Sequence, residues 1–361
     1  MPGFVCDSCS EKRDHEPWAD LLARFAMNAL IGEAELTPKP GLVDCRGAGA
    51  HTDMNLEMMR RSAHSLFPTF KRIARIAEGQ RPGNQLREQV GEAGRIGERR
   101  MLAETRGCNT HRGAIWTLGL LLAGAAMGRP AADACLIAER AAQLSRFRDR
   151  YAKTPPTNGS VVTRKFGVRG ARGEAESGFP HIIKIGLPAL LAARRRGVAE
   201  ERARLDALMA IMSSLVDTCL LYRGGWRALL IAKQGARTVL EHGGTGTSDG
   251  VEALMRLDAL LLDVHASPGG SADLLAGTLF LDSLSTHNAA YRKFQSLERP
   301  RTGTSAPQCG TGVLARQVVE NGLEISQTPG AGVPARARSR LQSVPGPRKS
   351  HERLWPVRFS R

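Results

Sequence analysis

The sequence predicts an all-α protein, a single multi-helix domain over residues 17–288 with glycine-rich loops. Three observations support this prediction. Apolar residues recur at helical spacing in one segment after another, and loops rich in glycine or proline separate these segments. No convincing alternation of β-branched residues occurs, and Val161–Val168 is the best candidate for a strand.

The first helix is predicted over Trp18–Glu33, where Trp18, Leu22, Phe25 and Ala29 recur on one face. The second is predicted over Leu56–Ala77, and Pro68 within it predicts a kink or a break. Further helices are expected at about 84–104, 112–127, 131–150, 181–195, 200–220, 226–241, 249–263 and 271–287.

The positive charge of the chain is concentrated near its C-terminal end. The net charge is +16, and residues 289–361 alone carry thirteen Lys/Arg and four Asp/Glu, which leaves +7 for the first 288 residues. This segment is rich in Pro, Gly, Ser and Arg, so we expect a disordered basic tail; residues 1–16 are expected to form a flexible arm. The charge therefore gives no reason to expect a specific nucleic-acid partner.

Composition also bears on location. The longest uncharged run, Gly113–Gly128, is shorter than the roughly 20 residues that span a bilayer, and no apolar stretch of signal-peptide type begins the chain. Seven scattered cysteines favour a reducing compartment. We expect a cytoplasmic protein without a membrane partner.

Four loop regions concentrate polar side chains beside glycine or proline. ELTPKPGLVD and CRGAGAHTDM supply Lys39, Asp44, His51 and Asp53. The predicted connection Lys153–Pro180 is unusually long and carries Arg169, Arg172, Glu174 and Glu176. TRGCNTHRGAI follows Glu104, and DTCLLYRGG and SPGGSADLLA supply Asp217, Arg223 and Asp273.

Two of these regions are suited to bind phosphate. Asn109, Thr110, His111 and Arg112 enter an apolar helix, so free backbone N–H groups and a cation meet at its N-terminus. Gly269, Gly270 and Ser271 offer a second helix start. Carboxylates on loops then suggest Mg²⁺, which is commonly shared with substrate phosphates.

Ordinary turn and cap chemistry explains each region taken alone, and structural ion pairs use the same residue types. The sequence contains no GxxxxGK[ST] motif, which excludes a P-loop, and no GxSxG or HExxH motif.

Taken in order, ELTPKPGLVD, GAHTDM, GCNTHRGAI, GVRGARGEAESGFP, DTCLLYRGG and SPGGSADLLA resemble the triphosphoribosyl-dephospho-coenzyme A synthases. The resemblance covers about 20–288 and is closer to the synthases associated with malonate decarboxylase than to those associated with citrate lyase. Cys108, Cys219 and Trp226 depart from the family's pattern, since Val, Asn and a smaller residue are expected there.

The resemblance implies an all-helical enzyme in which a ribose hydroxyl of 3′-dephospho-CoA displaces adenine from C1′ of ATP. It also implies a downstream partner, a transferase that places the product on an acyl carrier protein.

Such a reaction needs a base, a hydrogen-bond donor for the leaving purine and cations on the triphosphate. The candidate residues follow from these needs. The base or the metal ligands would come from Asp44, Asp53, Asp217 and Asp273, with Glu174 and Glu176 as rivals and Asp44, Asp217 and Asp273 as the metal candidates. His51 or His111 would assist the purine. The phosphates would be held by Lys39, Arg112, Arg169, Arg172 and Arg223, with Asn109, Thr110, Gly269, Gly270 and Ser271 beside them.

Two other functions remain open on the sequence alone. One is a helical Mg²⁺-dependent nucleotide hydrolase with water as the nucleophile. The other is a noncatalytic nucleic-acid-binding protein, suggested by the pI of 10.2 but opposed by the position of the charge in the tail.

Overall fold

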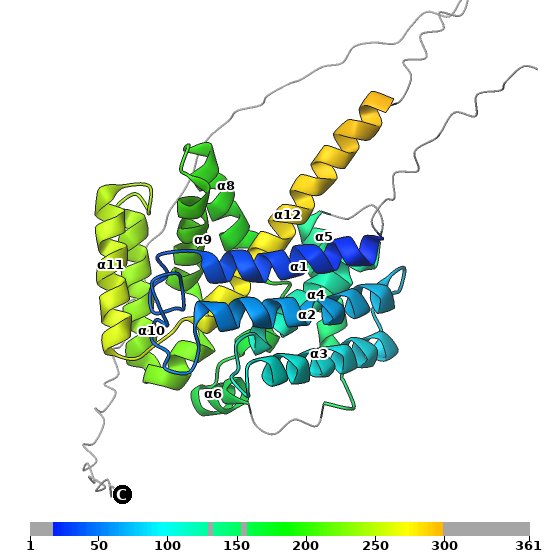
Figure 1. Cartoon of the computed structure of the whole chain (residues 1–361), viewed down its shortest axis with the longest axis horizontal. Coiled ribbons are helices and arrows are strands. Elements are labelled where there is room, and N and C mark those ends of the chain that lie inside the picture. Colours follow the sequence, from blue (N-terminus) through cyan, green and yellow to red (C-terminus); the bar gives the residue numbers. More distant parts are fainter. Residues whose placement is uncertain (1–16, 129–132, 153–156, 299–361) are drawn as a thin grey trace, which may run out of the picture. The chain divides into compact units, whose positions relative to one another are not determined.

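The computed structural model describes residues 17–128, 133–152 and 157–298 (Figure 1). These residues form α-helices and one π-helical segment, with no strand among them, and all belong to one compact unit. The predicted all-α fold is confirmed. The predictions for the arm 1–16 and for the tail beyond Glu298 lie outside the described residues.

The helices follow one another along the chain. Their bounds are α1 Trp18–Glu35, α2 Leu56–Ala77, α3 Asn84–Glu104, α4 Arg112–Ala126, α5 Ala134–Arg146, α6 Asn158–Phe166, α7 Gly170–Glu176, η1 Ile182–Gly186, α8 Leu187–Arg195, α9 Glu200–Ser214, α10 Thr218–Glu241, α11 Ser248–Asp263 and α12 Gly269–Glu298.

Helix α4 lies at the centre of the packing. It contacts α1, α2, α3, α5, α7 and α12, and every residue from Thr117 to Ala126 is buried. A helix that is apolar on all sides is stable only inside a protein, which explains the uncharged run in the sequence. Figure 1 shows α1, α2 and α3 side by side, in agreement with their contacts.

The second half of the fold continues from this centre. Helix α10 packs against α9 and α11, while α12 contacts α1, α4 and α9. The N-terminal ends of α4, α10 and α12 are thereby brought together, although they lie far apart in the sequence.

The strand candidate Val161–Val168 is wrong, because most of it is helix α6. The Thr157 side chain accepts a hydrogen bond from the Ser160 N–H at the start of this helix, and Gly167 ends it in the left-handed region at φ 68°. The expected long loop Lys153–Pro180 is also wrong, since it contains both α6 and α7. The helix caps at Thr157 and Gly167 thus outweighed the strand preference of Val161 and Val162.

Three predicted helix limits differ from the structure. Pro68 does not break α2, which is continuous while Leu66 and Phe70 on it are fully buried. The expected helix 200–220 is two helices, since α9 ends at Ser214 and α10 begins at Thr218. Helix α12 continues to Glu298, beyond the expected end at 287.

The segment ELTPKPGLVD is a rigid turn fixed to α11. The Lys39 N–H donates to Asp44 Oδ2 at 2.8 Å, and the Gly41 N–H donates to Asp258 Oδ1 at 2.8 Å. The Arg46 guanidinium forms ion pairs with the carboxylates of Asp44 and Asp258, at 2.8 Å to each. Gly41 has φ 68°, and a Cβ there would lie 2.5 Å from the Ala266 carbonyl oxygen, so the turn needs glycine.

Within the described residues, no single helix is both long enough and apolar enough to cross a membrane. Only the bent pair α9 and α10, taken together, reaches that length and composition.

Replacing Asp258 tests the anchoring of this turn. Asp258→Asn should lower the free energy of unfolding by about 1–3 kcal/mol, because the buried Asp258 carboxylate is the charged acceptor for both Arg46 and the Gly41 N–H. Urea denaturation measures this change.

Glu252→Gln on the same helix is the matched control. Glu252 pairs with Arg256 on the surface, where such pairs contribute about 0.5 kcal/mol or less. Equal losses in the two variants would contradict the anchoring role of Asp258.

Candidate active site

A cavity of about 930 Å³ lies where the N-terminal turns of α4, α10 and α12 meet the loops after α1 and α3. Helices α3 and α7 also contribute to its wall. Most of the residues predicted for the site line this cavity. They are Lys39, His51, Asp53, Asn109, Thr110, His111, Arg112, Arg169, Glu174, Asp217, Arg223, Gly269, Gly270 and Asp273.

Asp217 is buried and joins the starts of two helices. Its carboxylate accepts hydrogen bonds from the N–H groups of Cys219 and Leu220 on α10, at 2.8 and 3.4 Å. On α12 it accepts from the N–H groups of Gly270 and Ser271, at 3.3 and 2.7 Å, and from Ser271 Oγ at 2.9 Å. The helix start predicted to hold phosphate therefore holds an internal carboxylate.

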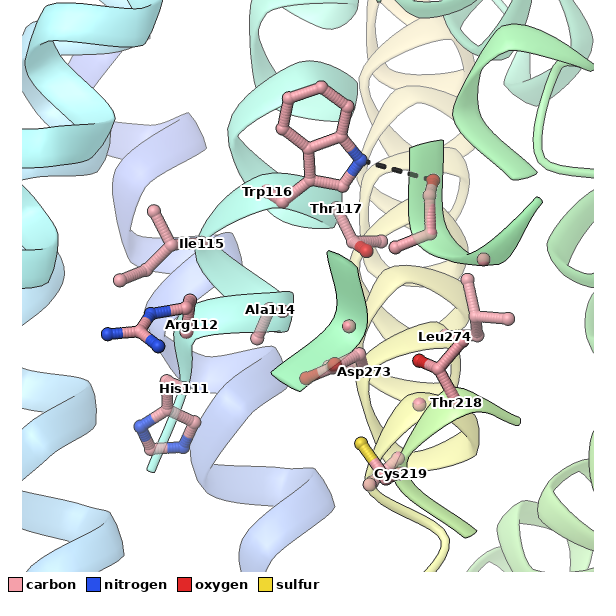
Figure 2. Close-up of a pocket in the computed structure, with 18 of the residues that line it drawn as sticks. His111, Arg112, Ala114, Ile115, Trp116, Thr117, Thr218, Cys219, Asp273 and Leu274 are labelled. Atoms are coloured by element: carbon pink, nitrogen blue, oxygen red, sulfur yellow. Dashed lines mark hydrogen bonds between the residues drawn. The ribbon is translucent and has the colours of Figure 1, made fainter. Parts of the chain in front are cut away.

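Asp273 lies one turn further along α12, in the cavity wall. Figure 2 shows it between the first turn of α4 and Cys219, and its carboxylate accepts a hydrogen bond from the Ala114 N–H. A Cβ on Gly113 would lie 1.9 Å from Asp273 Oδ2, so glycine is needed to admit the carboxylate. Burial raises the pKa of Asp273 well above its usual value, and the nearby Glu33 and Asp217 raise it further.

Lys39 is fully buried and already paired. Its Nζ donates to Glu33 Oε1 at 2.5 Å and to the Glu33 carbonyl oxygen at 2.6 Å. Its charge is therefore largely neutralised by Glu33. The prolines beside it fix a buried ion pair at the cavity wall, which the sequence did not indicate.

His111 is neutral. Its Nδ1 lies 2.7 Å from Ser62 Oγ, which is itself 2.6 Å from Thr110 Oγ1. Burial, followed by the charge of Lys39, lowers the pKa of His111 to about 3. Its buried Nε2 has no hydrogen-bond partner among the described residues. His111 can therefore offer a hydrogen bond but not a proton to a substrate.

His51 is held by two neighbours at the cavity mouth. Arg223 Nη2 lies 2.9 Å from its Nδ1, and Asp53 Oδ1 lies 3.6 Å from the same atom. Burial and then Arg223 lower the pKa of His51. Because the guanidinium can only donate, Nδ1 is the acceptor and the imidazole proton lies on Nε2.

The arginines predicted to bind phosphate have protein partners in this structure. The Arg112 guanidinium donates to Glu98 Oε1 at 2.5 Å, and the Arg112 backbone N–H donates to Asn109 Oδ1 at 3.2 Å. Arg169 is exposed and lies 3.2 Å from Glu176. Exposed pairs of this kind are weak, so a phosphate could displace the Glu176 carboxylate from Arg169.

Four predicted site residues do not line the cavity. Asp44 is held by Lys39 and Arg46 in the turn after α1, and Ser271 bonds Asp217. Arg172 and Glu176 bond each other on α7, at 2.7 Å. Glu174 does line the cavity, but both of its oxygens are taken by the N–H and Nδ1 of His181, each at 2.8 Å.

Cys219, one of the departures from the family's pattern, is half-buried and lines the cavity. Burial and the nearby carboxylates raise the pKa of its thiol well above the usual value, so the side chain is neutral. A Cβ on Gly269 would lie 3.1 Å from Cys219 Sγ, which shows that the thiol fills the space against α12.

The described residues contain no group of three or more His, Cys, Asp or Glu side chains placed to hold a metal ion. The predicted set of Asp44, Asp217 and Asp273 does not fit one, because Asp44 lies outside the cavity and the oxygens of Asp217 are taken. Asp273 and Asp53 are the members of the predicted carboxylate set that keep accepting capacity at the cavity.

Charges on the cavity wall nearly balance. Six Lys or Arg residues line it, against seven Asp or Glu residues. A triphosphate entering such a cavity brings about four negative charges and would need a further cation.

Several lining residues escaped the sequence analysis. They are Glu33, Arg87, Arg95, Trp116, Asp149 and His181. All but Asp149, which follows α5, lie inside a helix or at its end, where the same residue types serve ordinary packing and ion pairs. The helical register offers one signal, since Arg87, Gly91, Gly94 and Glu98 recur on one face of α3.

Together, the fold and the cavity define an all-helical protein with a large cavity lined by charged and polar side chains. Comparison with known proteins then gives the family. Residues 19–291 match CitG, described as ATP:dephospho-CoA triphosphoribosyl transferase, and the chain belongs to this family.

Curated relatives agree with the family match. A probable 2-(5″-triphosphoribosyl)-3′-dephosphocoenzyme-A synthase of Pseudomonas fluorescens Pf-5 is 53% identical over 273 residues, which is 75% of this chain and 94% of the relative. The 2-(5″-triphosphoribosyl)-3′-dephosphocoenzyme-A synthase of Klebsiella pneumoniae is 52% identical over 261 residues, 72% of this chain and 93% of the relative. No solved structure gives a significant match.

The raised pKa of Asp273 has a consequence for stability. A carboxyl whose pKa is higher in the folded state holds its proton there at a pH where the unfolded chain has lost it. Stability therefore declines as pH rises from the unfolded pKa to the folded pKa. Asp273→Asn should raise the free energy of unfolding at pH 8 and flatten this decline, as measured by urea denaturation at several pH values.

Asp263→Asn, at the exposed end of α11, is the control and should leave the decline unchanged. A decline of the same slope in wild type and Asp273→Asn would contradict the assigned environment of Asp273.

Proposed function

We propose that this chain transfers the triphosphoribosyl group of ATP to 3′-dephospho-CoA, forming 2′-(5″-triphosphoribosyl)-3′-dephospho-CoA and releasing adenine. Family membership and relatives at about 50% identity support this reaction. The observation that carries the proposal is the carboxylate of Asp273, which faces the cavity with a raised pKa and a backbone N–H as its hydrogen-bond partner. A general base needs these features.

Asp273 takes the proton of the attacking ribose hydroxyl. The oxygen then bonds to C1′ of ATP while the C1′–nitrogen bond to adenine breaks. The electron pair of that bond leaves with adenine, which takes up a proton from water. Glu33 and Asp217, close enough to raise the pKa of Asp273, add negative potential that favours the positive charge developing at C1′.

The histidines bind and orient the purine in this proposal. His51 presents an Nε2–H because its Nδ1 accepts from Arg223. A neutral imidazole can donate this hydrogen bond to a purine nitrogen as negative charge develops there. His111, also neutral, lines the same cavity, and its Nε2 has no hydrogen-bond partner among the described residues.

Magnesium is proposed to enter with ATP, bound mainly to its phosphates. The near balance of charge on the cavity wall supports this, because the wall cannot neutralise a triphosphate. Mg²⁺ keeps water ligands and commonly needs only one or two protein carboxylates. Asp53 is the carboxylate that fits this requirement, because Asp273 is assigned as the base, and the ion would supply positive charge to the phosphates.

Removal of divalent cations tests this proposal. With EDTA present, formation of the coupled product should fall at least about a hundredfold, because the triphosphate then meets uncompensated carboxylates. Added Mg²⁺ should restore the rate. Undiminished turnover in EDTA, measured by mass spectrometry, would contradict a requirement for the ion.

The product is proposed to serve the acyl carrier protein of malonate decarboxylase in the cytoplasm. This rests on the resemblance to the malonate-associated synthases in the sequence, and the citrate lyase system is the alternative. The product would pass to a transferase that attaches it to the carrier. Incubating the product and each transferase with each unmodified carrier distinguishes the two systems.

Replacement of the base tests the central step. Asp273→Asn should lower the rate of coupled-product formation by about 10²–10⁴-fold, since general-base catalysis contributes this much. In the wild type, kcat/KM should increase as pH rises through the raised pKa of Asp273, because the carboxylate form is the base. Mass spectrometry of adenine and coupled product measures both effects.

Asp263→Asn is again the control and should keep the wild-type rate. A wild-type rate in folded Asp273→Asn would overturn its role as base. Free adenine with ribose triphosphate but no coupled product would instead favour the hydrolase, and neither product would contradict both enzymatic proposals.

A further inference from the structure

One corner of the cavity differs in charge from the rest. We call it the Trp116 corner and define it by Arg87 and Arg95 on α3, Trp116 on α4 and Asp149 after α5, all of which line the cavity. None of these residues has a role in the reaction proposed above.

Arg87 is buried but poorly paired. It is 8% exposed, and its Nε has no hydrogen-bond partner among the described residues. The nearest carboxylate oxygen, Asp149 Oδ2, lies 3.7 Å from Nη1. Burial lowers the pKa of Arg87, the charge of Asp149 opposes this, and the charges of Arg95 and Arg172 lower the pKa further. A buried guanidinium with so little compensation points to an anion that is supplied by a ligand.

Asp149 supplies only part of that compensation, because its carboxylate is shared with other groups. Its Oδ2 lies 2.5 Å from Arg95 Nη1, and its Oδ1 accepts from the Tyr151 N–H at 3.0 Å. The corner therefore has two guanidinium groups and one carboxylate.

The rest of the cavity wall has the opposite balance. Apart from the corner, four cations face six carboxylates: Lys39, Arg112, Arg169 and Arg223 against Glu33, Asp53, Glu98, Glu174, Asp217 and Asp273. An anion without a metal ion is best placed in the corner, and a phosphate chain that carries Mg²⁺ is best placed in the acidic remainder.

The indole of Trp116 is held in a fixed position. Its Nε1–H donates to the Ala171 carbonyl oxygen at 3.2 Å, as Figure 2 shows by the dashed line. The Arg87 guanidinium carbon lies 5.2 Å from the ring centroid, a cation–π contact that ties the ring to the cation. A fixed indole at a cavity wall offers a stacking surface for a purine.

Helix α3 leaves space at this corner. A Cβ on Gly94 would meet only Ile115 Cγ2, at 3.8 Å, so protein packing does not require glycine there. Glycine within a helix costs about 1 kcal/mol relative to alanine. The missing side chain keeps part of the cavity open.

We propose that the Trp116 corner binds the adenosine diphosphate part of the acceptor dephospho-CoA, with its diphosphate against Arg87 and Arg95 and its purine on Trp116. The proposal rests on the function proposed above for the identity of the acceptor. Its ribose hydroxyl would then point toward Asp273 and the magnesium-bound triphosphate of ATP.

Calorimetric titration of the full-length protein with dephospho-CoA, and separately with MgATP, tests the assignment without requiring turnover. Arg87→Met should weaken dephospho-CoA binding at least about tenfold, the scale of one lost charge-assisted contact, and change MgATP binding less than about twofold. Arg100→Met, an exposed change on the same helix, should alter neither.

Gly94→Leu is the second variant, because it fills the corner without removing a protein contact and leucine favours the helix. It should also weaken the binding of dephospho-CoA more than that of MgATP, and Trp116→Leu should do the same. Circular dichroism verifies the fold of each variant, and Gly94→Leu decides the question if Arg87→Met unfolds.

Three results for the variants would overturn the proposal: equally weakened binding of both ligands, selectively weakened binding of MgATP, or unchanged dephospho-CoA binding in folded Gly94→Leu. A wild type that does not bind dephospho-CoA would also overturn it. Selective binding without any coupled product would support the corner while refuting the proposed reaction. The two failures are therefore distinguishable.

Discussion

The cavity depends on the carboxylate of Asp217, which joins the starts of α10 and α12. Buried N–H groups at a helix start need acceptors, and Asp217 satisfies those of two helices at once. Burial raises the pKa of Asp217, but its hydrogen bonds oppose this. Because Ser271 is fixed in this way, Asp273 is placed in the cavity wall two residues later.

Four of the six acidic residues considered for the same role divide according to what they touch. Asp44 and Asp217 accept several hydrogen bonds and stabilise the turn and the helix junction. Glu174 orients His181. Asp273 contacts Gly113 and the Ala114 N–H, and the cost of its burial is not offset by a cation. Residues that destabilise the free protein in this way are frequent at sites that act on a ligand.

The sequence was sufficient to predict the helical class, the cavity loops and the family, because helical periodicity and multi-residue motifs such as SPGGSADLLA are local features. It did not predict that α6 replaces the expected strand, since the Thr157 cap outweighs two valines. It also did not reveal that Lys39 is paired with Glu33, because the pairing depends on how the turn folds back on α1.

The Trp116 corner shows the same limitation. Arg87 and Asp149 are 62 residues apart along the chain, and only the packing of α3, α4 and the segment after α5 brings them to one cavity. A charge imbalance between two parts of a cavity is a property of three-dimensional arrangement. The sequence contains the charges but not their distribution.

The proposed reaction depends most directly on the protonation state of the Asp273 carboxyl. A ¹³C NMR titration of the aspartate carboxyl carbons, with Asp273→Asn to assign the signal, measures it in the intact protein. We expect the Asp273 signal to titrate well above the ordinary carboxyl range. A midpoint within the ordinary range would contradict the poorly compensated carboxylate in the cavity wall on which the proposed reaction rests.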